Sequence, residues 1–144
     1  MNPAISTGYS GTPLFKKLGI KPGMLVYLIH EPPGYKKLLA AESPVKFTSS
    51  TDKAALIQLF ASSASVFYEA MEQLKPIIDK NPEVVIWVSW CKKSSGIATD
   101  LTEALIRAYA LSTTLVDIKV CAVTEQWSGL KLVVRRKNRK RIDP

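Results

Sequence analysis

The chain has 144 residues, 47% of them hydrophobic and 22% charged, which is the composition of an ordinary soluble protein of one domain. No apolar run approaches the roughly 20 residues that a membrane-spanning helix needs. The first residues lack the basic and then apolar pattern of a secretory signal. We therefore expect no membrane contact and a cytoplasmic location.

The net charge of +8 is concentrated at the end of the chain. Residues 1–134 carry 14 Lys and Arg against 11 Asp and Glu, whereas the last ten residues carry six against one. Such a tail can hold the phosphates of a nucleic acid, or it can be a solvated segment that adds solubility. The candidate nucleic-acid contacts are Arg136, Lys137, Arg139, Lys140 and Arg141.

The first half of the chain predicts short elements. Residues 12–19 favour a helix, because a proline lies near its start and a glycine near its end. The apolar run 24–30 predicts the first strand, and the prolines of 32–42 begin a second short helix. Residues 44–49 predict a second strand. Residues 54–62 favour a third, because they precede a long helix.

That long helix is predicted over residues 62–75, where apolar residues repeat at helical spacing. Ser62 or Ser63 can cap its start, and Pro76 is expected to end or kink it. The apolar run 83–90 predicts a fourth strand, which leads into a polar loop.

A helix over residues 99–111 follows the loop, and two apolar strands over 115–126 and 129–137 close the chain. Only "WS" (127–128) separates the two strands, so they must pair antiparallel. The order predicts an α/β fold, a three-layer Rossmann-like sandwich with a mostly parallel sheet ending in an antiparallel hairpin. We expect one domain over 1–137, with an N-terminal arm over 1–23 and a basic tail over 138–144.

The arrangement resembles a shortened class I methyltransferase. "LGIKPGMLVYLIH" (18–30) is similar to that fold's entry to its first strand, and "LKPIIDKNPEVVIWVSW" (74–90) to the proline-containing turn before its fifth strand. The resemblance implies a strand order of 2-1-3-4-6-5, with the last strand antiparallel and inserted.

The residues that would bind the methyltransferase cofactor are absent from the sequence. The loop after the first strand reads "HEPPGY" (30–35), with one late glycine and two prolines that remove backbone donors. "FTSST" (47–51) replaces the acidic residue expected after the second strand, and "LFASSAS" (59–65) lacks the Asn/Asp-Pro-Pro-Tyr pattern. We therefore expect no S-adenosylmethionine and no other cofactor.

The chain also resembles a bacterial family of small proteins known as a domain of unknown function. Residues 8–24, 92–103 and 116–139 carry this resemblance. It implies the same fold and brings no activity with it.

The loop after the fourth predicted strand, "CKKSSGIATD" (91–100), is the leading candidate for a binding site. Lysine charges, serine hydroxyls and a glycine at the carboxyl end of a strand suit a phosphate, carboxylate or nucleotide. The alternative is a capping box formed by Asp100 and Glu103, with the lysines only solvating a turn. The candidate ligand-binding residues are Lys92, Lys93, Ser94, Ser95, Gly96 and Thr99.

Two further segments are secondary candidates. Trp127 and Ser128 lie at the expected turn of the last hairpin, where the indole either packs over the sheet or serves as a stacking platform. Tyr9 and Ser10 belong to an N-terminal segment that could complete a pocket or form an ordered arm.

The sequence assigns no catalytic residue and no metal site. Cys91 and Cys121 are too few for a disulfide framework and are expected to be reduced thiols in the core. A Cys91–His30 nucleophile pair is the alternative, without an evident third residue to orient it.

These patterns lead to one principal hypothesis and two alternatives. The first is a non-catalytic Rossmann-like protein that binds a small molecule bearing phosphate or carboxylate, or a partner, at the carboxyl edge of the strands. The alternatives are a nucleic-acid-associated protein that uses its basic tail and an enzyme whose reaction the sequence does not assign. No oligomeric state follows from the sequence.

Overall fold

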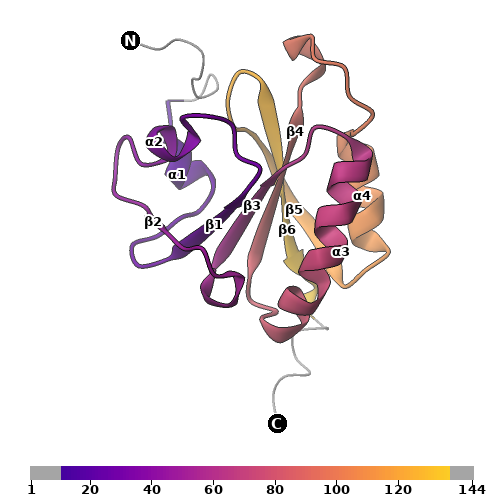
Figure 1. The fold of residues 1–144 in the computed structure, drawn as a ribbon, viewed down its shortest axis with the longest axis horizontal. Coiled ribbons are helices and arrows are strands. Elements are labelled where there is room, and N and C mark those ends of the chain that lie inside the picture. Colours follow the sequence, from indigo (N-terminus) through magenta and orange to yellow (C-terminus); the bar gives the residue numbers. More distant parts are fainter. Residues whose placement is uncertain (1–10, 137–144) are drawn as a thin grey trace.

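A computed structural model describes residues 11–136 as a six-stranded sheet with helices on both faces. Figure 1 shows α1 and α2 on one side of the sheet and α3 and α4 on the other. The strands are β1 (Leu25–Ile29), β2 (Lys46–Phe47), β3 (Leu56–Phe60), β4 (Val85–Cys91), β5 (Leu115–Ala122) and β6 (Trp127–Val134). The helices are α1 (Leu14–Lys17), α2 (Tyr35–Leu39), α3 (Ala64–Lys80) and α4 (Glu103–Leu111), with 3₁₀ turns η1 (Thr51–Lys53) and η2 (Lys93–Ser95).

The strand order is β2-β1-β3-β4-β6-β5, as predicted. β1 pairs parallel with β2 and β3, and β3 pairs parallel with β4. β6 inserts antiparallel between β4 and β5. The predicted α/β class, with a mostly parallel sheet that ends in an antiparallel hairpin, is therefore confirmed.

The core on the α1 side fastens two short helices to the sheet. Leu14 and Leu18 of the α1 region are buried against Trp87 of β4. The Trp87 indole Nε1 donates a 3.0 Å hydrogen bond to the Leu18 carbonyl, so the indole provides both apolar area and a polar anchor. α1 therefore belongs to the core, although its residues fall within the segment expected as an N-terminal arm.

α2 is held on the same side by a buried polar chain. The Tyr35 hydroxyl donates to Gln58 Oε1 at 2.6 Å, and Gln58 Nε2 donates to Ser89 Oγ at 3.3 Å. All three side chains are buried, so these hydrogen bonds offset the loss of their hydration. Burial raises the pKa of Tyr35, which keeps its hydroxyl protonated as a donor.

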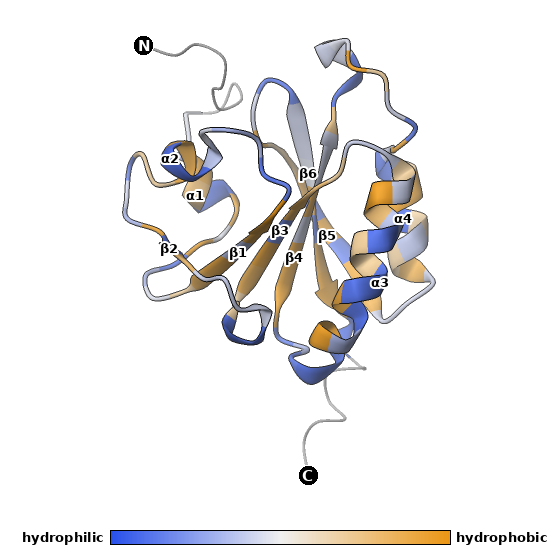
Figure 2. Ribbon diagram, viewed as in Figure 1, coloured by the Kyte–Doolittle hydropathy of each residue, from blue (hydrophilic) through white to orange (hydrophobic). Residues whose placement is uncertain are grey.

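The core on the other face is formed by α3 and α4 against β3, β4 and β6. Figure 2 shows the central strands in the hydrophobic colour, while blue residues mark the outward surface of α3. Phe67, Met71, Leu74 and Ile78 of α3 are buried at helical spacing, as the apolar periodicity predicts. Ser63 caps this helix, because its hydroxyl accepts from the Val66 N–H at 3.3 Å.

Two predicted boundaries are wrong. α3 continues through Pro76 to Lys80, with buried side chains at Leu74 and Ile78 on either side of the proline. The last hairpin turns at residues 123–126, and Trp127 begins β6 instead of forming the turn. In both places the burial of apolar side chains outweighs the local signal for a break. No helix within residues 11–136 is both long and apolar enough to cross a membrane.

Candidate functional site

The loop after β4 uses much of its own polar chemistry internally. The Ser95 hydroxyl donates to the Lys92 carbonyl at 2.6 Å and accepts from the Ile97 N–H. Gly96 has a φ of 78°, a left-handed conformation that glycine adopts readily. Lys93 and Ser94 are exposed in η2. The predicted residues therefore share a loop, but the Ser95 hydroxyl does not point to a common ligand with them.

Two hydrogen bonds connect the end of this loop to the loop that follows β3. The Thr99 hydroxyl donates to the Ser62 carbonyl at 2.9 Å, and Asp100 Oδ1 accepts from the Ala64 N–H at 2.8 Å. Asp100 therefore occupies an amide at the start of α3, a position where a carboxylate is favoured by the helix dipole. These two hydrogen bonds connect the loops that follow β3 and β4, at the carboxyl ends of two neighbouring parallel strands.

The alternative interpretation of this loop, a capping box formed by Asp100 and Glu103, is wrong. Thr102 caps α4, because its hydroxyl accepts from the Leu105 N–H at 3.2 Å. Glu103 pairs instead with Arg107, which also contacts Asp117 of β5 at 3.0 Å. α4 begins at Glu103, later than the sequence predicts, so Asp100 lies before this helix and accepts from the Ala64 N–H of α3 instead.

Trp127 packs over the sheet, which is the first of the two interpretations of that residue. Its side chain is 8% exposed and meets the Phe60 ring edge-on, with the centroids 5.1 Å apart. An indole buried in this way does not present a stacking platform to solvent. Ser128 is half-buried beside it in β6.

Lysines gather on the α1 side of the sheet. Lys119 and Lys131 lie directly opposite each other on β5 and β6, and Lys131 in turn lies opposite Trp87, whose indole faces α1. The Lys131 Nζ lies 3.8 Å from the position that a Cβ on Gly19 would take. Directly opposite residues of antiparallel strands share a face, so both lysines lie on the α1 side.

Lys17 and Lys92 complete this group around Cys121. Burial raises the pKa of the Cys121 thiol, and the charges of Lys17, Lys119 and Lys92 act in the opposite direction. Lys92 comes directly after β4, and Lys17 belongs to α1. We call Lys17, Lys92, Lys119 and Lys131 the lysine surface. Of these four, sequence analysis found only Lys92, since the others come from separate elements without a shared motif.

The two cysteines are core thiols, as expected. Both belong to the α1 side, Cys91 fully buried and Cys121 partly so. Burial raises the pKa of Cys91, which disfavours a thiolate nucleophile. His30 lies on the α3 side of the sheet, so the alternative of a Cys91–His30 pair is wrong. Among residues 11–136, no cluster of His, Cys, Asp and Glu could hold a metal ion.

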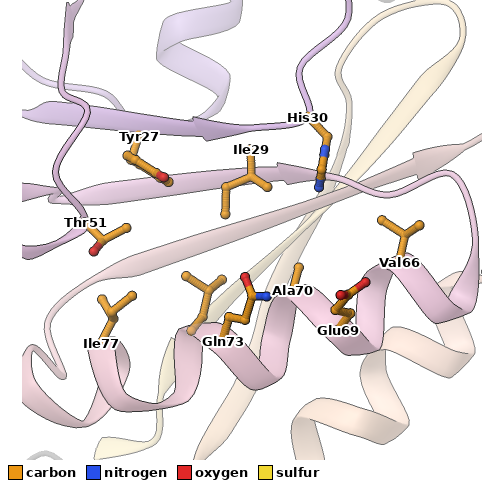
Figure 3. A pocket seen from close by; sticks show the side chains of 10 residues that line it. Tyr27, Ile29, His30, Thr51, Val66, Glu69, Ala70, Gln73 and Ile77 are labelled. Carbon is orange, nitrogen blue, oxygen red and sulfur yellow. The ribbon is translucent and has the colours of Figure 1, made fainter.

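A groove of about 310 Å³ runs between β1 and α3. Figure 3 shows Tyr27, Ile29 and His30 on its β1 side, and Glu69 and Gln73 on its α3 side. Thr51 of η1, in the connection between β2 and β3, also lines it. No sequence motif predicts this groove, and its one signal is a histidine directly after an apolar strand.

His30 has an unusual backbone. Its φ is 58°, and it is the only residue other than glycine with a positive φ in the described part of the chain. The left-handed conformation is unfavourable for a residue with a Cβ by roughly 1–2 kcal/mol. The surrounding fold maintains it, and it brings the imidazole to the mouth of the groove (Figure 3).

Several candidate residues lie outside the described part of the chain. Arg136 is exposed directly after β6. The secondary candidates Tyr9 and Ser10 precede residue 11, and the tail candidates Lys137, Arg139, Lys140 and Arg141 follow residue 136.

Two solved structures are similar to this chain. The B. subtilis M1A22 tRNA methyltransferase TrmK has a TM-score of 0.54 and 10% sequence identity, over 93% of this chain and 70% of that one. The ribosomal protein L11 methylase from Lactobacillus delbrueckii subsp. bulgaricus also has a TM-score of 0.54, with 12% identity over 85% and 75% of the two chains. No protein-family model and no curated protein matches the sequence.

These comparisons establish the fold of the chain and nothing further. At identities of 10% and 12%, no site residue of those enzymes is carried over to this chain. The methyltransferase-like fold that the sequence resembles is confirmed. Membership of the bacterial family of unknown function is not shown.

Proposed function

We propose that the chain is a non-catalytic protein of the methyltransferase-like fold that binds a phosphate- or carboxylate-bearing molecule on its lysine surface. The predicted loop contributes Lys92 to this surface, with Lys93 exposed beside it. The proposed site therefore lies closer to α1 and the last hairpin than the site predicted from the sequence, which is centred on the loop 91–100.

The observation that carries this proposal concerns three of the four lysines. Lys17, Lys119 and Lys131 make no ion pair within residues 11–136. In contrast, Lys75 of α3 pairs with Glu72, and Arg107 of α4 pairs with Glu103 and Asp117.

The cross-strand lysine pair strengthens the argument. Like charges directly opposite on antiparallel strands destabilise a sheet by a few tenths of a kcal/mol or more. Lys119 and Lys131 keep this arrangement, with a third lysine contributed by α1. A bound anion would convert the mutual repulsion into charge-assisted hydrogen bonds.

The loop after β1 supports binding without methyl transfer. After β1 and His30 the loop reads Glu31, Pro32 and Pro33, where glycines would let a nucleotide cofactor approach the backbone. Gly34 comes later, at the start of α2, with a φ of 82°. The loop therefore lacks the close backbone approach that dinucleotide and nucleoside cofactors use.

Thermal unfolding with and without pyrophosphate tests the proposal. Stabilisation should grow with ligand as RT ln(1 + [L]/Kd) in the native chain. The triple variant Lys17→Ala, Lys119→Ala and Lys131→Ala should lose this response. The variant Lys53→Ala, Lys75→Ala and Lys80→Ala removes the same charge from the other side and should keep it. Equal responses in both variants would reject the lysine surface as the site.

Nucleic acid is the second candidate, because its backbone offers a row of phosphates. Arg136 is exposed after β6, and the sequence beyond it adds four basic residues against one acidic residue. Deleting residues 137–144 should flatten the dependence of log K on log salt by up to about 0.7–0.9 per lost phosphate contact. An unchanged slope in filter-binding or fluorescence titrations would exclude the tail as the contact.

A further inference from the structure

The groove beside β1 occupies a favoured place in an open α/β sheet. β1 and β3 are neighbours, yet α2 follows β1 onto one face and α3 follows β3 onto the other. Ligands of such sheets bind where the connections diverge, outside the carboxyl ends of the strands. His30 and Val66 line the end of the groove that lies nearest this point.

The lining combines an apolar floor with unoccupied polar groups. Ile29, Val66, Ala70, Leu74 and Ile77 form the floor, which suits a flat apolar ring. The side chains of Tyr27, His30, Thr51, Glu69 and Gln73 have no hydrogen-bond or ion-pair partner within residues 11–136. His30, Glu69 and Gln73 are exposed and Tyr27 and Thr51 are half-buried, so the polar groups of a ligand can replace the water at these side chains.

The charge of the lining selects the ligand class. Glu69 is the one acidic residue that lines the groove, and no Lys or Arg lines it. Figure 3 shows the Glu69 carboxylate and the His30 ring directed toward the same opening. An ammonium group has three donors and no acceptor, so the Glu69 carboxylate and the Gln73 amide oxygen match it.

We propose that this groove binds a small organic cation, an amine carried on an apolar ring. The ring lies on the aliphatic floor beside Tyr27, whose aromatic face also attracts a cation. The amine meets Glu69 at the rim. The site is separate from the lysine surface, which lies across the sheet and selects the opposite charge.

Tryptamine and indole-3-acetate provide a matched pair of probes, because they share a ring and differ in charge. In amide NMR titrations of the full chain, tryptamine should shift the signals of Ile29, Ala70 and Gln73. It should bind at about millimolar Kd or better, the range of a fragment-sized ligand. Indole-3-acetate should bind the same residues about tenfold more weakly or not at all.

The exposed Glu69 allows a substitution that leaves the core intact. Glu69→Gln should remove the preference for tryptamine, whereas Asp79→Asn on the same helix, outside the groove, should keep it. Equal affinity for both probes in the native chain would overturn the proposal. So would tryptamine shifts confined to other residues, or a Glu69→Gln variant that binds tryptamine as the native chain does.

Discussion

Trp87 joins the first helix to the centre of the sheet. Its side chain is fully buried in β4, and its Nε1 donates to the Leu18 carbonyl at 3.0 Å. This hydrogen bond and the packing of Leu14 and Leu18 hold the helix that carries Lys17 against the sheet. The position of Lys17 on the proposed binding surface therefore depends in part on this buried indole.

Trp87→Ala should lower the free energy of unfolding by about 3–5 kcal/mol, because it empties a large volume in the core. Trp87→Phe retains much of the apolar area but leaves the Leu18 carbonyl without its donor. This variant should lower the free energy of unfolding by about 1–3 kcal/mol. Urea denaturation followed by circular dichroism measures both. A loss below about 1 kcal/mol for the alanine variant would contradict the central position of this residue.

Asp100 is expected to stabilise α3 and not α4. Asp100→Ala should lower the free energy of unfolding by about 0.5–2 kcal/mol, because the Ala64 N–H loses its acceptor. Asp100→Asn retains an oxygen acceptor and should lose less. In amide hydrogen exchange, the first turn of α3 should lose protection in the alanine variant. Loss confined to the first turn of α4 would contradict the assignment.

At the scale of elements, β6 packs so closely on the sheet that Gly129 has no room for a side chain. Gly129 lies opposite Ser89 and Cys121, and a Cβ on it would stand 3.0 Å from Val123 Cγ2 and 3.1 Å from Trp87 Cε3. Both neighbours are fully buried. Close packing of the hairpin on the indole therefore requires glycine at this position.

Gly129→Ala should lower the free energy of unfolding by about 1–3 kcal/mol through overpacking. Ser128→Ala, at the half-buried neighbouring position, serves as the control and should stay within about 0.5 kcal/mol of the native chain. The midpoint of urea unfolding measures the change in stability of both variants. An alanine at 129 that is as well tolerated as the one at 128 would show that the hairpin can shift away from Trp87.

The strands and their order could be predicted because each element carries its own signal. Apolar runs at β1, β3 and β4 and the short hairpin connection specify a parallel sheet with an antiparallel end. The hydrogen bonds of Thr99 and Asp100 to Ser62 and Ala64 could not be predicted, because they join residues that are 36 or 37 positions apart in the sequence. The lysine surface and the groove could not be predicted for the same reason, because their residues come together only when the sheet has formed.

At the scale of the whole molecule, the two faces of the sheet differ in charge. The lysine surface lies on the α1 side, whereas α3 and α4 carry four acidic residues (Glu69, Glu72, Asp79, Glu103) against three basic ones (Lys75, Lys80, Arg107). An anionic ligand therefore meets a more favourable field on the α1 side than on the side of α3 and α4. This difference would favour the proposed anion site, which lies away from the groove beside β1.

S-adenosylmethionine should not bind the purified chain appreciably. The loop after β1 offers Glu31, Pro32 and Pro33 in place of glycines, and two of these lack a backbone N–H. Isothermal titration calorimetry should give no heat at micromolar cofactor. A micromolar Kd would contradict the proposal of a fold retained without its cofactor.

An amide NMR titration with pyrophosphate tests the central claim most directly, because it locates the anion on the folded chain. The account predicts saturable shifts at Lys17, Lys92, Lys119 and Lys131, with the amides of α3 unaffected. The shifts should weaken as salt is added, since screened charges hold the ligand less tightly. Saturable shifts confined to residues 93–96 or to α3, or no shifts at all, would contradict it.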